Sequence, residues 1–200
     1  MEDKYIIALG ASAGGLSALF EFFDNTLPDA VSYVITMHLY PHQKSHLTEV
    51  VQKHSAIVVC EVEDAMQIQA NTVYVMPENK VMTIDNGKLI LTPRNLSIKV
   101  NMAIDIFFRS LAKDALFNKI AIIFSGMGHD GSEGIKMISE GGGYIIAQDP
   151  NSADQSSMPL SVIAGGYTDE ILQPKQMPKS IREYLARQLA IKIASEQPVD

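Results

Sequence analysis

This sequence of 200 residues has one cysteine, fewer basic than acidic residues, and no apolar run as long as a membrane-spanning helix. The single cysteine, Cys60, excludes an internal disulfide and a cysteine-rich metal site, and its apolar neighbours predict a buried structural thiol. The 16 Lys and Arg residues against 23 Asp and Glu residues give a net charge of −7. Because there is also no basic stripe, nucleic acid is not expected as a partner, and neither is insertion into a membrane.

The start and the composition of the chain bear on its location and its organisation. The N-terminal residues include Glu2 and Asp3 and lead directly into a strand pattern, unlike a signal peptide, so we expect a cytoplasmic protein. Hydrophobic residues make up 46% of the chain, which is enough for a large core. The chain has no internal repeat or low-complexity segment. Its length predicts one domain over residues 1–194, followed by a flexible tail at residues 195–200.

Apolar runs of strand length alternate with helical patterns along the chain. The expected strands are residues 5–9, 31–37, 57–60, 71–76, 119–125, 144–147 and 168–172. The first expected helix begins near Gly14. The other expected helices cover residues 45–54, 101–116, 132–140, 159–164 and 178–193. An Asn86-Gly87 pair between two further apolar runs predicts a β-hairpin. The pattern predicts an α/β fold: a doubly wound, mostly parallel sheet with helices on both faces and an antiparallel β-hairpin addition.

The turn at residues 10–15 has the sequence Gly-Ala-Ser-Ala-Gly-Gly and lies between the first strand and the first helix. Ser12 is therefore expected at the carboxyl end of a strand, where open α/β sheets hold their sites. The turn lacks the spacing of a dinucleotide fingerprint, the lysine of a phosphate loop and the spacing of a lipase-type elbow. Two interpretations remain: Ser12 caps the helix, or its hydroxyl is reactive and open to close approach by a substrate.

Two more turns place polar residues after expected strands. His38 follows the strand at residues 31–37, and Asp130 lies in the sequence Gly-Met-Gly-His-Asp-Gly after the strand at residues 119–125. Parallel strands would bring both turns to the same sheet edge as Ser12.

A serine, a histidine and an aspartate at one edge are the parts of a catalytic triad. A serine hydroxyl needs a neighbouring base, and that base needs an acidic group to hold its tautomer. An oxyanion would also need backbone N–H donors, for which Met127 and the residue after Ser12, Ala13, are candidates.

Each of these residues has an alternative, purely structural interpretation. Asp130 precedes a glycine, so it could be a turn or helix-cap residue. His38 could be a hydrogen-bonded histidine at a strand end. His129 is a rival base, but it adjoins Asp130 in sequence and is expected to point away from it. Ser17 and Ser125 are rival nucleophiles without such small neighbours.

His42 and His46 are four residues apart near a helix start, a spacing that could bind a metal. No third ligand is evident, so a solvated helix face is the expected state and no metal site is predicted. His54 is expected to be a surface residue.

Six sequence motifs, in order, resemble those of the CheB family, the protein-glutamate methylesterases of bacterial chemotaxis. Three are the motifs at residues 10–15, 37–41 (Met-His-Leu-Tyr-Pro) and 126–131. The others lie at residues 73–77 (Val-Tyr-Val-Met-Pro), 104–110 (Ile-Asp-Ile-Phe-Phe-Arg-Ser) and 147–150 (Ala-Gln-Asp-Pro), the last continuing to Met158-Pro159. The resemblance covers roughly residues 5–185.

The resemblance implies a role for each residue of the site. It makes Ser12 the nucleophile, His38 the general base and Asp130 the residue that orients His38. It places the Met127 N–H in the oxyanion hole. It implies hydrolysis of glutamate γ-methyl esters on the cytoplasmic helices of methyl-accepting chemotaxis receptors, with deamidation of receptor glutamines as a second activity. It implies no cofactor and no metal.

The chain departs from the family pattern in three ways. Ala13 stands where relatives often have threonine, which bears on rate and substrate preference. The stretch from His38 to Pro41 is one residue longer than usual and is similar to the esterase domains of fused methylesterase/methyltransferase proteins. No receiver domain precedes Tyr5, so we expect an always-open site, regulation in trans, or a domain of a larger protein. A methyltransferase or receiver domain, in cis or in trans, is then an expected partner. The alternative function is a catalytically weak binding or scaffold module of a chemosensory protein.

Overall fold

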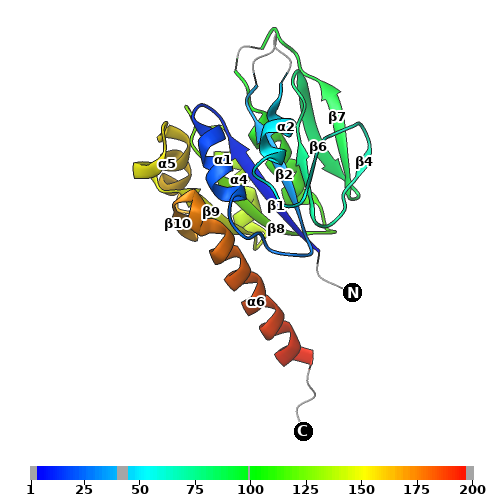
Figure 1. Cartoon of the computed structure of the whole chain (residues 1–200), viewed down its shortest axis with the longest axis vertical. Helices are drawn as coiled ribbons and strands as arrows, with labels where there is room; N and C mark the ends of the chain where they lie inside the picture. Colours follow the sequence, from blue (N-terminus) through cyan, green and yellow to red (C-terminus); the bar gives the residue numbers. More distant parts are fainter. Residues whose placement is uncertain (1–3, 40–44, 99, 197–200) are drawn as a thin grey trace.

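A seven-stranded, wholly parallel sheet forms the centre of the structure, a computed structural model that describes residues 4–39, 45–98 and 100–196 (Figure 1). Its strand order is β10-β9-β8-β1-β2-β5-β3. The strands are β1 (Tyr5–Ala11), β2 (Val31–Met37), β3 (Val58–Glu61), β5 (Thr72–Val75), β8 (Asn118–Ile123), β9 (Tyr144–Gln148) and β10 (Glu170–Leu172). The chain moves from β1 to β2 on one side, whereas β8 pairs with β1 on the other. The sheet therefore reverses its order between β1 and β8, the position at which such sheets form a crevice.

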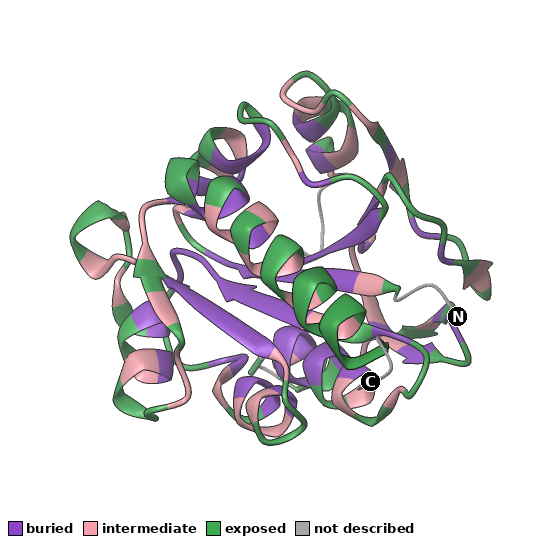
Figure 2. Ribbon diagram, turned by 90° about the horizontal axis from the view of Figure 1, so that it is seen from below, coloured by how far each residue is buried: buried purple, intermediate pink, exposed green. Residues whose placement is uncertain are grey.

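Helices cover both faces of this sheet, which confirms the doubly wound fold predicted from the sequence. They are α1 (Gly15–Phe23), α2 (Leu47–Gln52), α3 (Ala103–Lys113), α4 (Ser132–Glu140), α5 (Ser157–Ala164) and α6 (Met177–Glu196). Alternate residues of β1 enter two separate apolar clusters, Ile6 with α3, α4 and α5, and Ile7 with α1, α2 and α6. Figure 2 shows the main-sheet strands buried between helices that each have an exposed side.

A second, antiparallel sheet of three strands, in the order β4-β7-β6, packs against α3. Its strands are β4 (Met66–Gln67), β6 (Lys80–Asp85) and β7 (Lys88–Pro93). The predicted hairpin is confirmed: Asn86 and Gly87 form its turn with φ angles of 48° and 75°. The hairpin belongs to this separate sheet and does not extend the parallel one. β4 was not predicted, since a two-residue strand has no periodicity to detect.

Several elements end at other residues than the sequence suggests. α3 spans residues 103–113 instead of 101–116, because Asn101 accepts the Ala103 N–H ahead of it and Asp114 is extended after it. α2 spans residues 47–52 instead of 45–54. α6 continues through Glu196, into the segment expected as a tail, and residues 197–200 lie outside the described part.

Two surface features remain. Cys60 is half-buried and free, and burial raises the pKa of its thiol above the ordinary range. α6 packs on the domain through its first turns and then extends beyond it (Figure 1). Within the described residues, no helix has the length and apolar character needed to cross a membrane.

Candidate active site

Ser12 lies in a tight turn between the end of β1 and the start of α1. Gly14 has a φ of 74°, and a Cβ added to it would lie 2.4 Å from the Cβ of Asp154. A Cβ on Gly15 would lie 2.7 Å from that of Ala11. The small residues of this turn are therefore required by its packing. The cap position of α1 is Gly14, and no side chain caps the helix, so the structure does not use Ser12 as a cap.

The sheet register places Ser12 next to His38. Ala11 is paired with Met37 in the β1–β2 ladder, and the His38 N–H donates to the Ala11 carbonyl at 3.2 Å. Ser12 and His38, the residues that follow this pair, therefore leave the sheet at the same level. On the other side of β1, the Ser12 N–H donates to the Ser125 carbonyl at 3.0 Å.

The side chains of Ser12, His38 and Asp130 form one hydrogen-bonded chain. Ser12 Oγ lies 3.1 Å from His38 Nδ1, and His38 Nε2 lies 2.7 Å from Asp130 Oδ2. Ionised Asp130 can only accept, so Nε2 carries the proton and Nδ1 presents its lone pair to the Ser12 hydroxyl. Ser12 is 9% exposed, Asp130 is 4% exposed, and the His38 side chain is 20% exposed. The structure brings together the three residues predicted from three distant turns.

The Asp130 carboxylate is held by the first turn of α3. Oδ2 accepts the Ile104 N–H at 3.0 Å, and Oδ1 accepts the Asp105 N–H at 2.8 Å. These N–H groups lie at a helix N-terminus, where they have no acceptor within the helix itself. Asp130 is therefore a helix cap in part, as the structural alternative suggested. The helix that it caps is α3, however, and not α4, which begins directly after it.

The backbone at residues 125–127 passes close to Ser12. A Cβ added to Gly126 would lie 3.0 Å from Ser12 Cβ and 2.0 Å from Met158 Sδ, so only glycine allows this approach. In the described chain the N–H groups of Ala13 and Met127 donate no hydrogen bond to protein atoms. The Met127 side chain is 63% exposed. Both predicted oxyanion donors are thus available for a ligand.

The rival residues are used differently. The Ser125 hydroxyl is fully buried and donates to the Ala13 carbonyl at 2.8 Å while it accepts the Gln155 N–H at 2.9 Å. Ser17 donates to the Gly14 carbonyl at 3.0 Å. His129 is exposed. Within the described residues, neither rival serine forms a hydrogen bond with a histidine.

Sequence reasoning missed the structural importance of Ser125 and of buried Gln148. The Gln148 side chain accepts the Ser125 N–H at 2.8 Å and donates to the Ser152 carbonyl at 3.0 Å. Together they join the turn after β1, the turn after β8 and the loop before α5. The only signal in the sequence is their position at the ends of apolar strands.

The remaining histidines that the structure describes belong to no metal-binding cluster. His46 lies 3.7 Å from Glu49 on an exposed surface, and His42 falls outside the described residues. His54 pairs with Asp24 at 2.8 Å at the end of α1. Among the residues that are described, no three histidine, cysteine or acidic side chains are arranged to hold a metal ion.

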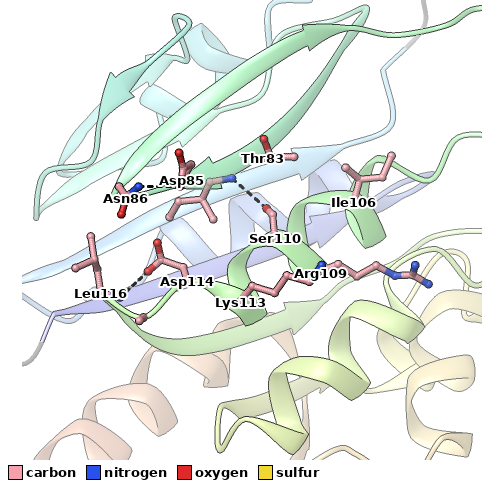
Figure 3. Close-up of a pocket in the computed structure, with 11 residues that line it drawn as sticks. Thr83, Asp85, Asn86, Ile106, Arg109, Ser110, Lys113, Asp114 and Leu116 are labelled. Atoms are coloured by element: carbon pink, nitrogen blue, oxygen red, sulfur yellow. Dashed lines mark hydrogen bonds between the residues drawn. The ribbon is translucent and has the colours of Figure 1, made fainter.

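An open pocket of about 660 Å³ lies between β6 and α3 and includes none of the three hydrogen-bonded residues (Figure 3). Arg109 and Lys113 of α3 line it opposite Asp85 of the hairpin. The Ser110 hydroxyl accepts the Ile84 N–H at 3.0 Å and thereby ties the hairpin to the helix. We assign this pocket no part in the site.

A Ser–His–Asp hydrogen-bonded chain at the carboxyl edge of a parallel sheet, beside backbone N–H groups without a partner in the described chain, is the arrangement found in serine hydrolases, which occur on unrelated folds. Comparison with known proteins identifies the particular group. The chain belongs to the CheB methylesterase family, whose members match it over residues 7–181.

Similar proteins include both solved and curated examples. The crystal structure of the Thermotoga maritima CheB methylesterase catalytic domain superimposes with a TM-score of 0.80 and is 28% identical, covering 92% of this chain and 100% of that one. The protein-glutamate methylesterase/protein-glutamine glutaminase of Photorhabdus laumondii is 28% identical over 197 residues, which are 96% of this chain and 56% of that protein. An uncharacterized 104.1 kDa protein of Rhodobacter capsulatus is 34% identical over 141 residues, 70% of this chain and 15% of that protein. The chain thus spans about half the length of curated methylesterases and a small part of the larger relative.

Proposed function

We propose that this chain is a serine hydrolase that demethylates glutamate γ-methyl esters on methyl-accepting chemotaxis receptors and also deamidates receptor glutamines. The observation that carries the proposal is the continuous hydrogen bonding from Ser12 Oγ through His38 to Asp130. The names of the similar curated proteins, which combine methylesterase and glutaminase, support the reaction and the substrate class.

In the proposed reaction Ser12 is the nucleophile and His38 the general base. His38 Nδ1 takes the hydroxyl proton as Oγ attacks the ester carbonyl, and Asp130 stabilises the imidazolium that results. His38 returns the proton to the departing methoxide, which leaves as methanol. Water, activated by the same imidazole, then hydrolyses the acyl-enzyme and releases glutamate. With a glutamine substrate the leaving group is ammonia.

The N–H groups of Met127 and Ala13 are proposed as the oxyanion hole. Ala13 directly follows Ser12, and Met127 directly follows Gly126, whose backbone passes close to Ser12. Neither N–H is used within the described chain. Two preorganised donors stabilise the negative charge that develops on the carbonyl oxygen. Side chains and backbone supply every step, so the proposal includes no cofactor and no metal.

The partners follow from the proposed reaction. The cytoplasmic helices of a chemotaxis receptor are the proposed substrate, which places the protein in the cytoplasm. A receiver or methyltransferase domain, in cis or in trans, is proposed as the regulatory partner.

The substitution Ser12→Ala tests the nucleophile. Methanol release from a methylated receptor should fall by at least about a thousandfold, since removal of one triad member disables the set. Ser17→Ala, in the first turn of α1, is the control and should keep the parental rate. A Ser12→Ala protein that releases methanol near the parental rate would contradict the assignment.

A further inference from the structure

The two helices beside Asp130 cap each other reciprocally. The Asp130 carboxylate accepts the Ile104 and Asp105 N–H groups at the start of α3. In return, Asp105 Oδ1 accepts the Gly134 N–H, at 2.8 Å, in the first turn of α4. Neither helix is capped by the side chain of its own cap residue. Since α4 begins directly after Asp130, the Asp105 side chain holds the backbone that carries Asp130.

The contact between α3 and α4 leaves little room for either helix to shift. A Cβ added to Gly134 would lie 2.3 Å from Phe108 Cβ, so α3 and α4 are in direct contact at this point. A shift of the α4 start would therefore move Asp130 relative to both α3 and the His38 ring. The Asp130–His38 distance of 2.7 Å depends on that placement.

A carboxylate side chain is unusual at the buried contact between α3 and α4, where Asp105 lies. It is 2% exposed, and its Oδ2 atom is buried without a hydrogen-bond partner in the described structure. Two groups face it: the carboxylate of Asp130 and the guanidinium of Arg109 on its own helix. Burial and the neighbouring Asp130 charge raise the pKa of Asp105 above its ordinary range, against the opposing effects of the Gly134 and Gly131 N–H groups and of Arg109. A surface cap would not require this desolvation.

We propose that Asp105 is a positioning residue for Asp130, which it holds through the hydrogen bond to the start of α4 and not through a negative charge. The inference rests on the proposed function, because its consequence is the rate of the Ser12–His38 step. Loss of the acceptor loosens the Asp130–His38 contact, which lowers kcat. The substrate-binding surface is unaffected, so KM stays the same.

The test compares Asp105→Asn with Asp105→Ala in the full 200-residue chain. Asn keeps a carbonyl oxygen for the Gly134 N–H and removes the charge, so kcat for methanol release should stay within about threefold. Ala removes the acceptor, and misplacement of this kind lowers kcat by about 10- to 100-fold with KM unchanged. If Asp105→Ala does not fold, Asp105→Ser, with an oxygen on a shorter side chain, should lower kcat in the same direction.

Two results would overturn the inference. An acceptor-free variant that melts earlier yet keeps the parental kcat would show that Asp105 is merely structural. Equal losses in Asp105→Asn and Asp105→Ala would show that the charge matters.

The labelling rate of Ser12 by a fluorophosphonate gives a second readout that needs no receptor. It should fall in Asp105→Ala and not in Asp105→Asn. A wild-type protein that labels but releases no methanol contradicts the proposed substrate alone, whereas one that does neither contradicts both proposals.

Discussion

Two hydrogen bonds link the proposed nucleophile, Ser12, to His38 and His38 to Asp130. They join residues that are 26 and 92 positions apart in the sequence. Ser12 directly follows β1, His38 directly follows β2, and Asp130 lies in the turn between β8 and α4. Each side chain is nearly buried and hydrogen-bonded, so little conformational freedom remains to be lost when a substrate binds. At the scale of single residues, the proposed activity requires the His38 tautomer that carries its proton on Nε2.

Asp130→Asn tests this dependence on the tautomer. An Asn amide can donate to His38 Nε2, which would place the ring proton on Nδ1 and leave Ser12 without an acceptor. We expect kcat to fall by about 10³- to 10⁴-fold, as for the equivalent change in other Ser–His–Asp sites. The rate of methanol release measures the effect.

The chain contains a matched control for that substitution. Asp24 and His54 form a second histidine–aspartate pair at 2.8 Å, at the opposite end of α1 from Ser12. Asp24→Asn should leave kcat unchanged. Equal losses in both variants would contradict the role given to Asp130.

At the scale of elements, the turns are as constrained as the side chains that they carry. Gly126 is the position where the turn after β8 passes Ser12. Its φ is not in the left-handed region, so the backbone accepts alanine, but the added Cβ would overlap Met158 Sδ and press on Ser12 Cβ. The site therefore depends on the absence of one methyl group.

Gly126→Ala should lower both stability and activity. Overpacking of this kind costs about 1–3 kcal/mol in the free energy of unfolding, and the displaced Ser12 should lower kcat. Urea unfolding and methanol release are the two measurements. Gly141→Ala, where the added Cβ makes only ordinary contacts at 3.4 Å, is the control. A Gly126→Ala protein with parental stability and kcat would contradict the packing described here.

Some elements were predictable from the sequence and others were not. The strand before Ser12 and the Asn86-Gly87 hairpin follow from local patterns, and both were predicted. The two-residue β4 arises only because it can pair with β7, and the ends of α3 depend on caps. Ser12, His38 and Asp130 were predictable as candidates because each lies in the turn that follows a buried strand. Asp105 was not, because its role arises from a contact between α3 and α4 that no local pattern encodes.

At the scale of the whole molecule, the order of the sheet decides where these elements meet. β1 pairs with β2 on one side and β8 on the other, so all three turns lie at one edge. The alternation of expected strands and helices along the chain predicted this class of sheet. That the hairpin forms a separate sheet over α3 depends on long-range packing, which periodicity does not report.

The buried carboxyl of Asp105 should also make the stability of the whole molecule depend on pH. Its pKa is raised in the folded protein by burial and by Asp130, whereas in the unfolded chain it is ordinary. The folded protein is therefore favoured by protonation of Asp105. This contribution to the free energy of unfolding is fully present below the pKa of Asp105 in the unfolded chain, near 3.8, and is lost as pH rises through its higher pKa in the folded protein.

In Asp105→Asn the amide side chain does not titrate, so this variant should not show the pH-dependent loss of stability. The free energy of unfolding of Asp105→Asn minus that of the wild type should increase as pH rises from about 4 until the folded pKa of Asp105 is passed. Urea unfolding of both proteins across that range measures it. A difference that stays constant or decreases with rising pH would contradict the raised pKa.

The central claim is that Ser12 is a nucleophile activated by His38. Intact-mass and peptide-mass analysis after treatment with a fluorophosphonate tests it most directly, because this reagent needs the same activated hydroxyl as the ester. We expect a single adduct on Ser12 in the wild type and none in a folded His38→Ala protein. A folded wild-type protein without an adduct, or one labelled equally in His38→Ala, would contradict it and favour a binding module of the same fold.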